Sequence, residues 1–559
     1  MRSKAIVPAL LLTMFSLASC GADDDSRLSL SGSVRSEPGD MTGPFFIALA
    51  NTADLAEIER DPLSAIVELI NVDGNDGSFS IDLSQSSLRP GDEISIIAFA
   101  DSDYRGGVPY PTEGDFVGLY VDGARFTMGY RLLEGPNDGI DITINRRVYD
   151  FEATVSGTLA ANGPSDCVLI AYAGDIDSFD FSSLDFNAVI GYRRIGSGEL
   201  TSDYSMKILP YGFDVPVSGV YLLALFDRNG NGLPDAGDGI GYYSEDPSGL
   251  PTLITIEPGR RTGLDIVERL RIPAPSGQAV SIAGSFEAPA GYDADAPPVF
   301  VIVAESNDPN AIFDDPLSAI RYFRRLPRGE SSFDLDLSAT GLSPGDEVML
   351  LVLWDRDYVA GFPGPTAGDY AGFYQNNDEL RNTVALQPGE TTIRPGGDNW
   401  SFALKRKIFD HGASVSFMLD PGGLPDYGDA NRAILVAVHK NGLDLLQMQI
   451  ADMDYIVGMV NLPLDFTSEH TMKIFPALYC DPDTGSTISG DPFELGDIYL
   501  LAILDNNPAN GGPDSGEYLG YYYTRLGINP FYIYLPATFT VTNGPVTLPR
   551  AVRFTGQRY

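Results

Sequence analysis

Internal repetition is the feature that most limits how this chain can fold. The stretch SFSIDLSQSSLRPGDEISIIAFADSDY (78–104) returns as SFDLDLSATGLSPGDEVMLLVLWDRDY (332–358). In the same way, PTEGDFVGLY (111–120) returns as PTAGDYAGFY (365–374). The offset is 254 residues in both cases (332 minus 78, 365 minus 111), so there is no gap between the copies. Repetition of this kind means that one structural unit has been copied along the chain.

A second pair of repeats lies between and after the first pair. YSMKILP (204–210) resembles HTMKIFP (470–476), and YLLALFDRNGNGLPDAGDGIGYY (221–243) resembles YLLAILDNNPANGGPDSGEYLGYY (499–522). The order is therefore A–B–A′–B′, and IPAPSGQA (272–279), which is uncharged and contains proline, is expected to link the two halves. We predict four tandem modules, over residues 28–148, 149–272, 279–408 and 409–559.

The hydrophobic pattern within a module is that of strands. Segments such as SFSIDLS, EISIIAFA and YLLALF alternate or run apolar for five to eight residues. The 60 glycines and 40 prolines favour turns between them, and an apolar content of 43% is too high for a disordered chain. About seven strands in a module of this length are typical of a two-layer sandwich. We therefore predict an all-β chain made of β-sandwich modules.

The modules resemble the transthyretin-like, or carboxypeptidase regulatory-like, β-sandwiches of secreted proteins. The resemblance rests on an opening x-S-G-x-V strand (LSLSGSV, 28–34), on SFSIDL followed by LRPGDEISIIAF in the middle, and on a final I-x-I strand (IDITI, 140–144). It implies a sandwich whose central hairpin turns at Pro-Gly. The D-E pair after that turn and the long acidic insertions depart from the family's pattern.

The N-terminus resembles a bacterial lipoprotein signal. A basic start and a short apolar stretch lead to Leu17-Ala18-Ser19-Cys20, which is similar to a lipobox. The resemblance implies a signal peptide over 1–19, acylation of Cys20 and an acidic tether over 20–27. Gly21 follows the cysteine, and by the same resemblance an outer-membrane location is expected. An ordinary cleaved signal with a chance cysteine remains the alternative.

The charge and the cysteines exclude several classes of partner and stabilising bond. With 77 acidic and 36 basic side chains, the formal net charge is −41, so nucleic acid is not expected as a partner. The expected partners are the membrane, through the lipid anchor, and an extracellular protein or glycan. Besides Cys20, only Cys167 and Cys480 are present, in places that do not correspond, so no disulfide framework is predicted.

An acidic loop follows an apolar strand in the second module. Its oxygen-bearing residues occupy positions 1, 3, 5, 7, 9 and 12 of the spacing found in calcium loops, with Gly232 at position 6: Asp227, Asn229, Asn231, Leu233 (by its carbonyl), Asp235 and Asp238. Alternate side chains of such a loop can point to one centre and supply the six to eight oxygens that Ca²⁺ takes. A solvated polar turn is the alternative.

The other three modules carry related loops. The fourth offers Asp505, Asn507, Asp514 and Glu517. The first and third lack the Asn-Gly core, and their candidates are Asp101, Asp103 and Asp115, and Asp355, Asp357 and Asp369. Ca²⁺ is the expected ion. For these last two loops, however, a solvated acidic loop is the expectation, and metal binding is the alternative.

No catalytic motif accompanies these loops, so an enzyme is not predicted. We expect a lipid-anchored, calcium-stabilised repeat protein of the bacterial cell envelope that acts as a surface scaffold or adhesin-like binding protein. The alternative function is carbohydrate binding by exposed aromatic residues. Its candidates are the clusters after the acidic loops: Tyr242 and Tyr243, Phe373 and Tyr374, and Tyr521 to Tyr523.

Overall fold

The structure, a computed structural model, describes most of the chain after the N-terminal segment. The described residues are 27–37, 43–52, 58, 62–72, 77–121, 127–176, 184–196, 203–230, 234–245, 249–274, 279–289, 292–293, 295–306, 309–314, 316–358, 363, 365–376, 381–394, 400–422, 432–445, 449–481, 486–489, 493–505, 517–528 and 531–558. The predicted signal peptide and Cys20 lie outside them. The chain forms two compact units, residues 1–120 with 128–148, and residues 121–127 with 149–559.

Strands dominate both units, which confirms the predicted all-β class. The described helices are short: α2 (Pro62–Ala65), α3 (Pro309–Asp314), α4 (Pro316–Ala319) and the single 3₁₀ turns η3 (Phe186–Ala188), η4 (Lys440–Gly442) and η5 (Met453–Tyr455). None of the described helices has the length and apolar character needed to cross a membrane. The number of modules stays a prediction, and "first" to "fourth module" below name only the residue ranges given above.

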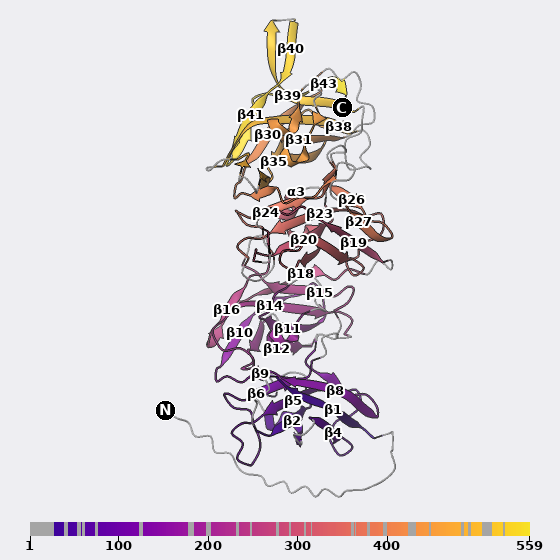
Figure 1. Ribbon diagram of the computed structural model, residues 1–559, viewed down its shortest axis with the longest axis vertical. Helices are drawn as coiled ribbons and strands as arrows, with labels where there is room; N and C mark the ends of the chain where they lie inside the picture. The colour runs from indigo at the N-terminus through magenta and orange to yellow at the C-terminus, as the bar shows by residue number, and fades with distance from the viewer. Residues whose placement is uncertain are drawn as a thin grey trace. The chain divides into compact units, whose positions relative to one another are not determined.

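The first unit consists of two sheets around one core (Figure 1). The smaller sheet has the order β4 (Ser78–Asp82), β1 (Ser29–Ser36), β8 (Pro136–Ile144). The larger has the order β3 (Ile66–Val72), β2 (Phe45–Ala50), β5 (Glu93–Ala100), β6 (Phe116–Leu119), β9 (Arg146–Arg147), with β7 (Tyr130–Arg131) on β5. Alternate residues of both sheets, among them Leu30, Ile47, Ile96 and Ile142, form a common apolar cluster.

The third module repeats this plan. Its small sheet has the order β22 (Ser332–Asp336), β19 (Val280–Ser285), β27 (Gly389–Ile393). Its large sheet begins with β21 (Ile320–Arg325), β20 (Val299–Ala304), β23 (Glu347–Trp354), β24 (Tyr370–Phe373), β29 (Arg406–Ile408), with β26 (Thr383–Ala385) on β23. The opening strand pairs parallel with a late strand in both modules, β1 with β8 and β19 with β27. The same pairing in two copies agrees with the repeated sequence.

In the second module the strands join into one sheet path. Its order is β12 (Val189–Ile195), β11 (Asp166–Tyr172), β14 (Val217–Asp227), β15 (Gly239–Tyr243), β18 (Ile266–Arg271), β10 (Ala153–Ala160), β13 (Asp203–Lys207), with β16 (Ile254–Ile256) on β14 and β17 (Gly259–Arg261) on β10. The two cysteines outside the signal region, Cys167 in β11 and Cys480, are buried and free.

The fourth module follows the second. Its sheet has the order β34 (Ile456–Pro463), β31 (Arg432–His439), β38 (Glu494–Asp505), β39 (Tyr518–Ile528), β43 (Val552–Arg558), β30 (Ser414–Asp420), β35 (Glu469–Lys473). Strands β40 (Phe531–Pro536), β41 (Thr538–Thr542) and β42 (Pro545–Thr547) pair at its sides. Two small ladders complete the third and fourth modules, β25 (Gln375–Asn376) with β28 (Trp400–Ser401), and β32 (Leu443–Asp444) with β33 (Gln449–Ile450).

One hairpin of the fourth module lies in the sheet of the third. Strand β36 (Ala477–Asp481) pairs antiparallel with β29, and β37 (Ser486–Thr487) follows it at the edge. In the sequence, 22 residues (477–498) separate MKIFP from YLLAIL, whereas 10 residues (211–220) separate MKILP from YLLALF in the second module. The hairpin is therefore an insertion peculiar to the fourth module.

Candidate metal centre

Each acidic loop connects two neighbouring antiparallel strands, and the register places its first and last acids opposite each other. The last pair of the ladder is Ala100 with Phe116 in the first module and Trp354 with Tyr370 in the third. One step further along, the register pairs Asp101 with Asp115 and Asp355 with Asp369. The same extrapolation pairs Asp227 with Asp238 and Asp505 with Glu517. Like charges directly across a ladder repel, so each loop begins with an unfavourable pair.

These paired acids are buried. The exposed fraction is 4% or less for each of those for which it is described: Asp101, Asp115, Asp227, Asp238, Asp355, Asp369 and Glu517. Because a buried carboxylate loses its hydration, it needs hydrogen-bond donors or a cation. Each buried acid of a loop is therefore stabilised either by donors of the chain or by a bound cation.

The last acid of the loop is held by backbone donors. Asp115 Oδ1 accepts from the N–H of Ser102 at 2.9 Å, and Oδ2 from the N–H of Thr112 at 2.8 Å. In the third module Asp369 accepts from the N–H groups of Arg356 and Thr366, both at 2.8 Å. In the second module the N–H groups of Arg228 and Asp235 donate to the last acid at 2.9 and 3.1 Å. This carboxylate thus closes the loop in all three modules.

A short sequence motif at the end of the loop explains these hydrogen bonds, and it was not recognised from the sequence. Counted from their last acid, the four loops read PTEGD (111–115), PDAGD (234–238), PTAGD (365–369) and PDSGE (513–517). In the first three, the residue three before the acid donates its N–H to that acid, and the glycine before the acid has a positive φ of 95°, 97° or 109°. Only glycine adopts that conformation without strain. Aligning the loops from their ends rather than their starts reveals the motif.

Three carboxylates converge in the first and third loops. Oxygens of Asp101, Asp103 and Asp115 lie within 4.8 Å of one another, and so do oxygens of Asp355, Asp357 and Asp369. Two oxygens bound to one Ca²⁺ at about 2.3–2.6 Å can be separated by at most about 5 Å. The gathered oxygens therefore fit the coordination sphere of one such ion. In both triads the first and last acids are buried and the middle acid is exposed.

Asp101 has few hydrogen-bond donors, so a cation would stabilise its charged form. Its Oδ1 is buried and has no hydrogen-bond partner among the described residues, while Oδ2 receives one long bond from the Tyr110 N–H at 3.4 Å. Burial, then Asp103 and the charge of Asp115, raise the pKa of Asp101. Burial also acts on Asp115, but hydrogen bonds from Ser102 and Thr112 outweigh it and lower the pKa of that carboxyl. One acid of the pair is satisfied by the protein and the other is not.

The second loop is arranged differently over its described residues. The amide nitrogen of Asn229 donates to Asp235 at 2.7 Å, and Asp227 accepts from the Gly230 N–H at 2.7 Å. Arg228 donates to the Gly237 carbonyl and forms an ion pair with buried Glu268, so a cationic side chain already lies beside the loop. Burial raises the pKa of Asp238. Asn231, Gly232 and Leu233 lie outside the described residues, as do Asn507 and Asp514 of the fourth loop.

The aromatic residues after the loops are mostly buried. The exposed fractions are 9% or less for Tyr242, Tyr243, Phe373, Tyr374, Tyr521 and Tyr522. Tyr243, Tyr374, Tyr521 and Tyr522 belong to the apolar cores, so their rings are not exposed for a sugar to stack on. The exposed aromatic near a loop is Tyr110, at 58%.

The pH dependence of stability distinguishes Asp101, which lacks hydrogen-bond donors, from Asp115, which is held by several. Because the folded-state pKa of Asp101 is raised, the folded chain takes up this proton more readily than the unfolded chain. Without divalent cations, this acid should cost stability at about pH 7.5. The cost should shrink as the pH falls through the raised pKa and disappear below about 3.9, where the unfolded chain is protonated as well. Urea denaturation of the wild type and of Asp101→Asn in chelator checks this. The stability gap between them should narrow at the lower pH, and a constant gap would contradict the expectation.

Comparisons with known proteins leave the family open. No family model and no curated protein sequence matches the chain. Among solved structures, a shaft pilin from Lactobacillus rhamnosus GG is 10% identical, with a TM-score of 0.12, and the match covers 44% of this chain and 99% of the pilin. A streptococcal ancillary pilin is 11% identical, with a TM-score of 0.12, over 73% and 100% of the two chains. The minor pilin of Streptococcus agalactiae is 11% identical, with a TM-score of 0.13, over 44% and 99%. At these scores the likenesses carry no argument.

Proposed function

We propose that this chain is a lipid-anchored scaffold of the bacterial cell envelope, built from tandem β-sandwich modules whose acidic loops bind Ca²⁺. The observation that carries the proposal is the pair of carboxylate triads, Asp101 with Asp103 and Asp115, and Asp355 with Asp357 and Asp369. The two triads occupy corresponding positions in the first and third modules, as expected for a binding site that was copied with the module. The role is structural and binding, without catalysis.

The bound ion would reduce the electrostatic repulsion between acids that the fold places opposite each other. The register brings two acids together at the end of a ladder, and burial removes the water that would screen them. A divalent ion replaces that water with a positive charge and fixes both strands at the loop. The second and fourth loops remain candidates because of their calcium-type spacing, with Asp227, Asp238, Asp505 and Glu517 at their ends.

Calorimetric titration of the mature chain with Ca²⁺ tests the metal sites. We expect saturable binding that weakens when Asp101→Asn and Asp355→Asn are introduced together. The matched control is Asp334→Asn, which removes an exposed acid of strand β22 in the third module, away from the loop. Loss of binding with Asp227→Ala alone would assign the ion to the second loop instead. No heat of binding in the wild type would refute the metal part of the proposal.

The lipid anchor has its own test. We expect that the mature chain begins at Cys20 and carries fatty acid there, as the lipobox resemblance implies. Metabolic labelling with a fatty-acid analogue should label the wild type and leave Cys20→Ser unlabelled. An unlabelled wild-type protein, or an N-terminus at another residue, would contradict the anchor without affecting the metal sites.

A further inference from the structure

We infer that the third and fourth modules unfold as one cooperative unit, because the fourth module supplies a strand and core residues to the third. The inference concerns the joint between them and is independent of metal binding. Three observations carry it: the inserted β36–β37 hairpin, the position of Cys480, and the buried side chain of Arg406.

The inserted hairpin completes the large sheet of the third module. Without the hairpin, the short strand β29 would form the edge of this sheet. Strand β36 pairs with it through Arg406 with Tyr479, Lys407 with Leu478, and Ile408 with Ala477. The ladder continues at both ends, where Cys480 N–H donates to the Lys405 carbonyl at 2.7 Å and Phe409 N–H to the Pro476 carbonyl at 2.9 Å. A strand added to a sheet edge in this way gains main-chain hydrogen bonds along its length.

The same strand joins the two hydrophobic cores. Leu478 belongs to the apolar cluster of the fourth module, whereas Cys480, two residues later on the same face, belongs to that of the third. Cys480 is 2% exposed, and its sulfur lies 3.9 Å from the hydroxyl of Tyr370 in β24. Pulling the modules apart would therefore expose core residues of both.

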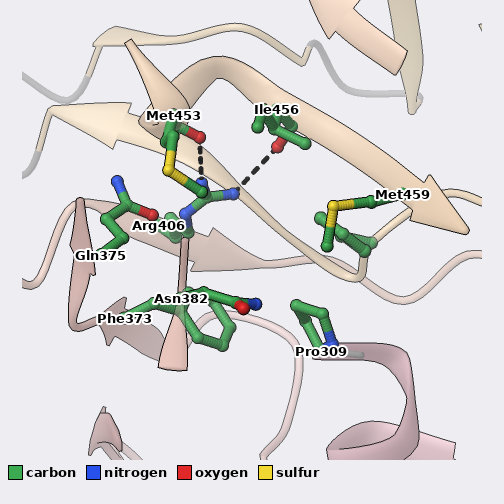
Figure 2. A pocket seen from close by; sticks show the side chains of 9 residues that line it. Pro309, Phe373, Gln375, Asn382, Arg406, Met453, Ile456 and Met459 are labelled. Atoms are coloured by element: carbon green, nitrogen blue, oxygen red, sulfur yellow. Dashed lines mark hydrogen bonds between the residues drawn. The ribbon is translucent and has the colours of Figure 1, made fainter. Parts of the chain in front are cut away.

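Arg406 fixes the joint from the other side. Its side chain leaves β29 and donates to three carbonyls of the fourth module, those of Met453 at 2.6 Å, Ile456 at 3.0 Å and Ala477 at 3.4 Å. The first two belong to the 3₁₀ turn η5 and the residue that ends it, and the Met453 carbonyl also accepts the N–H of Ile456. Figure 2 shows the guanidinium between Met453 and Ile456, with Gln375, Asn382 and Phe373 around it.

The surroundings of Arg406 make this contact costly to break. The residue is 3% exposed, and its charge lies 5.5 Å from the centre of the Phe373 ring. Burial lowers the pKa of the guanidinium, and the nearby Asp454 and Asp452 oppose that effect. Asp454 also accepts from Gln375 Nε2 of the third module at 2.7 Å. Removing the guanidinium would remove three hydrogen bonds from a buried, charged donor, and such bonds are stronger than those between neutral groups.

The joint between the second and third modules offers a contrast. One described contact across it is an ion pair between Arg325 and Asp175, with an N–O distance of 2.6 Å and side chains 22% and 43% exposed. Exposed pairs of this kind contribute little to stability. Arg325→Met is therefore the matched control for Arg406→Met, since both remove an arginine at a module joint.

Thiol reactivity of Cys480 measures opening of the joint in the full chain. A background with Cys20→Ser and Cys167→Ala leaves Cys480 as the sole thiol. Arg406→Met should speed its modification by a thiol reagent about tenfold to a hundredfold, as expected for losing hydrogen bonds to a charged group. Arg406→Lys should fall between, and Arg325→Met should leave the rate unchanged. Equal rates in Arg406→Met and Arg325→Met would overturn the inference.

Two further measurements separate the joint from general misfolding. With Cys167 as the sole thiol instead, Arg406→Met should not alter its reactivity, because Cys167 lies in the core of the second module. Replacing residues 477–498 with residues 211–220 gives the fourth module the shorter connection of the second. In calorimetry, the third and fourth modules should melt together in the wild type and separately in this variant. A variant that keeps one joint transition would refute the inference.

Discussion

Removing divalent cations from the mature chain should lower its melting temperature, with the first and third modules affected most. An ion that binds only the folded state stabilises it by RT ln(1 + [L]/Kd), about 2.7 kcal/mol at a hundred times Kd. The chelated protein loses this term and also exposes the repulsion between acids such as Asp101 and Asp115. Calorimetric scans in calcium and in chelator measure the difference.

The variants assign this effect to the loops. Asp355→Asn should abolish the calcium response of the third module while leaving that of the first, and Asp101→Asn should do the reverse. Asp334→Asn should leave both responses intact. If calcium and chelator give the same melting temperature in the wild type, the acidic loops are solvated turns braced only by Asp115, Asp369 and their equivalents.

Gly372→Ala should destabilise the third module strongly, by roughly 3 kcal/mol or more, because it forces an atom into the backbone of a neighbouring segment. A Cβ at this position would lie 2.2 Å from the Ala403 carbonyl oxygen. The equivalent Gly118 of the first module approaches the Thr143 carbonyl oxygen in the same way, at 2.4 Å. This close approach explains why a glycine follows the acidic loop in the first and third modules.

The matched control for this substitution is Gly412→Ala. An added Cβ at Gly412 meets nothing within 4 Å, so its effect should stay within about 0.5 kcal/mol. Thermal unfolding of the two variants compares them, and Gly372→Ala should melt about 10 °C lower in the transition that includes the third module. Similar melting of both variants would show that the backbone around Ala403 yields easily.

The sequence predicted the fold class and the position of the loops because both depend on local pattern. Alternating apolar residues identify β5 and β23, and the repeat offset shows that the loops after them correspond. The register that pairs Asp101 with Asp115 is that of β5 with β6, the strands on either side of the first loop. Where a loop is bounded by two recognisable strands, its end residues can be placed from sequence.

The choice among the loops could not be made from sequence spacing. Asp227 to Asp238 match the calcium-loop spacing best, yet among the described residues the gathered carboxylates are those of the first and third loops. Spacing describes a loop that folds on itself, whereas here the ladder and the P-T-x-G-D turn set the geometry. Arg406 was missed for a related reason. Nothing near it in the chain reveals that carbonyls fifty and seventy residues later will surround it.

The strand that the fourth module supplies to the third has a consequence for the order in which the modules fold. A chain that emerges N-terminus first presents β29 well before β36. During that interval the third module has an open sheet edge and a gap where Cys480 belongs, and unpaired edges of this kind recruit other chains. The module that carries the second acidic triad is thus the one whose folding must wait for its successor, and it is most exposed to aggregation in the interval before β36 appears.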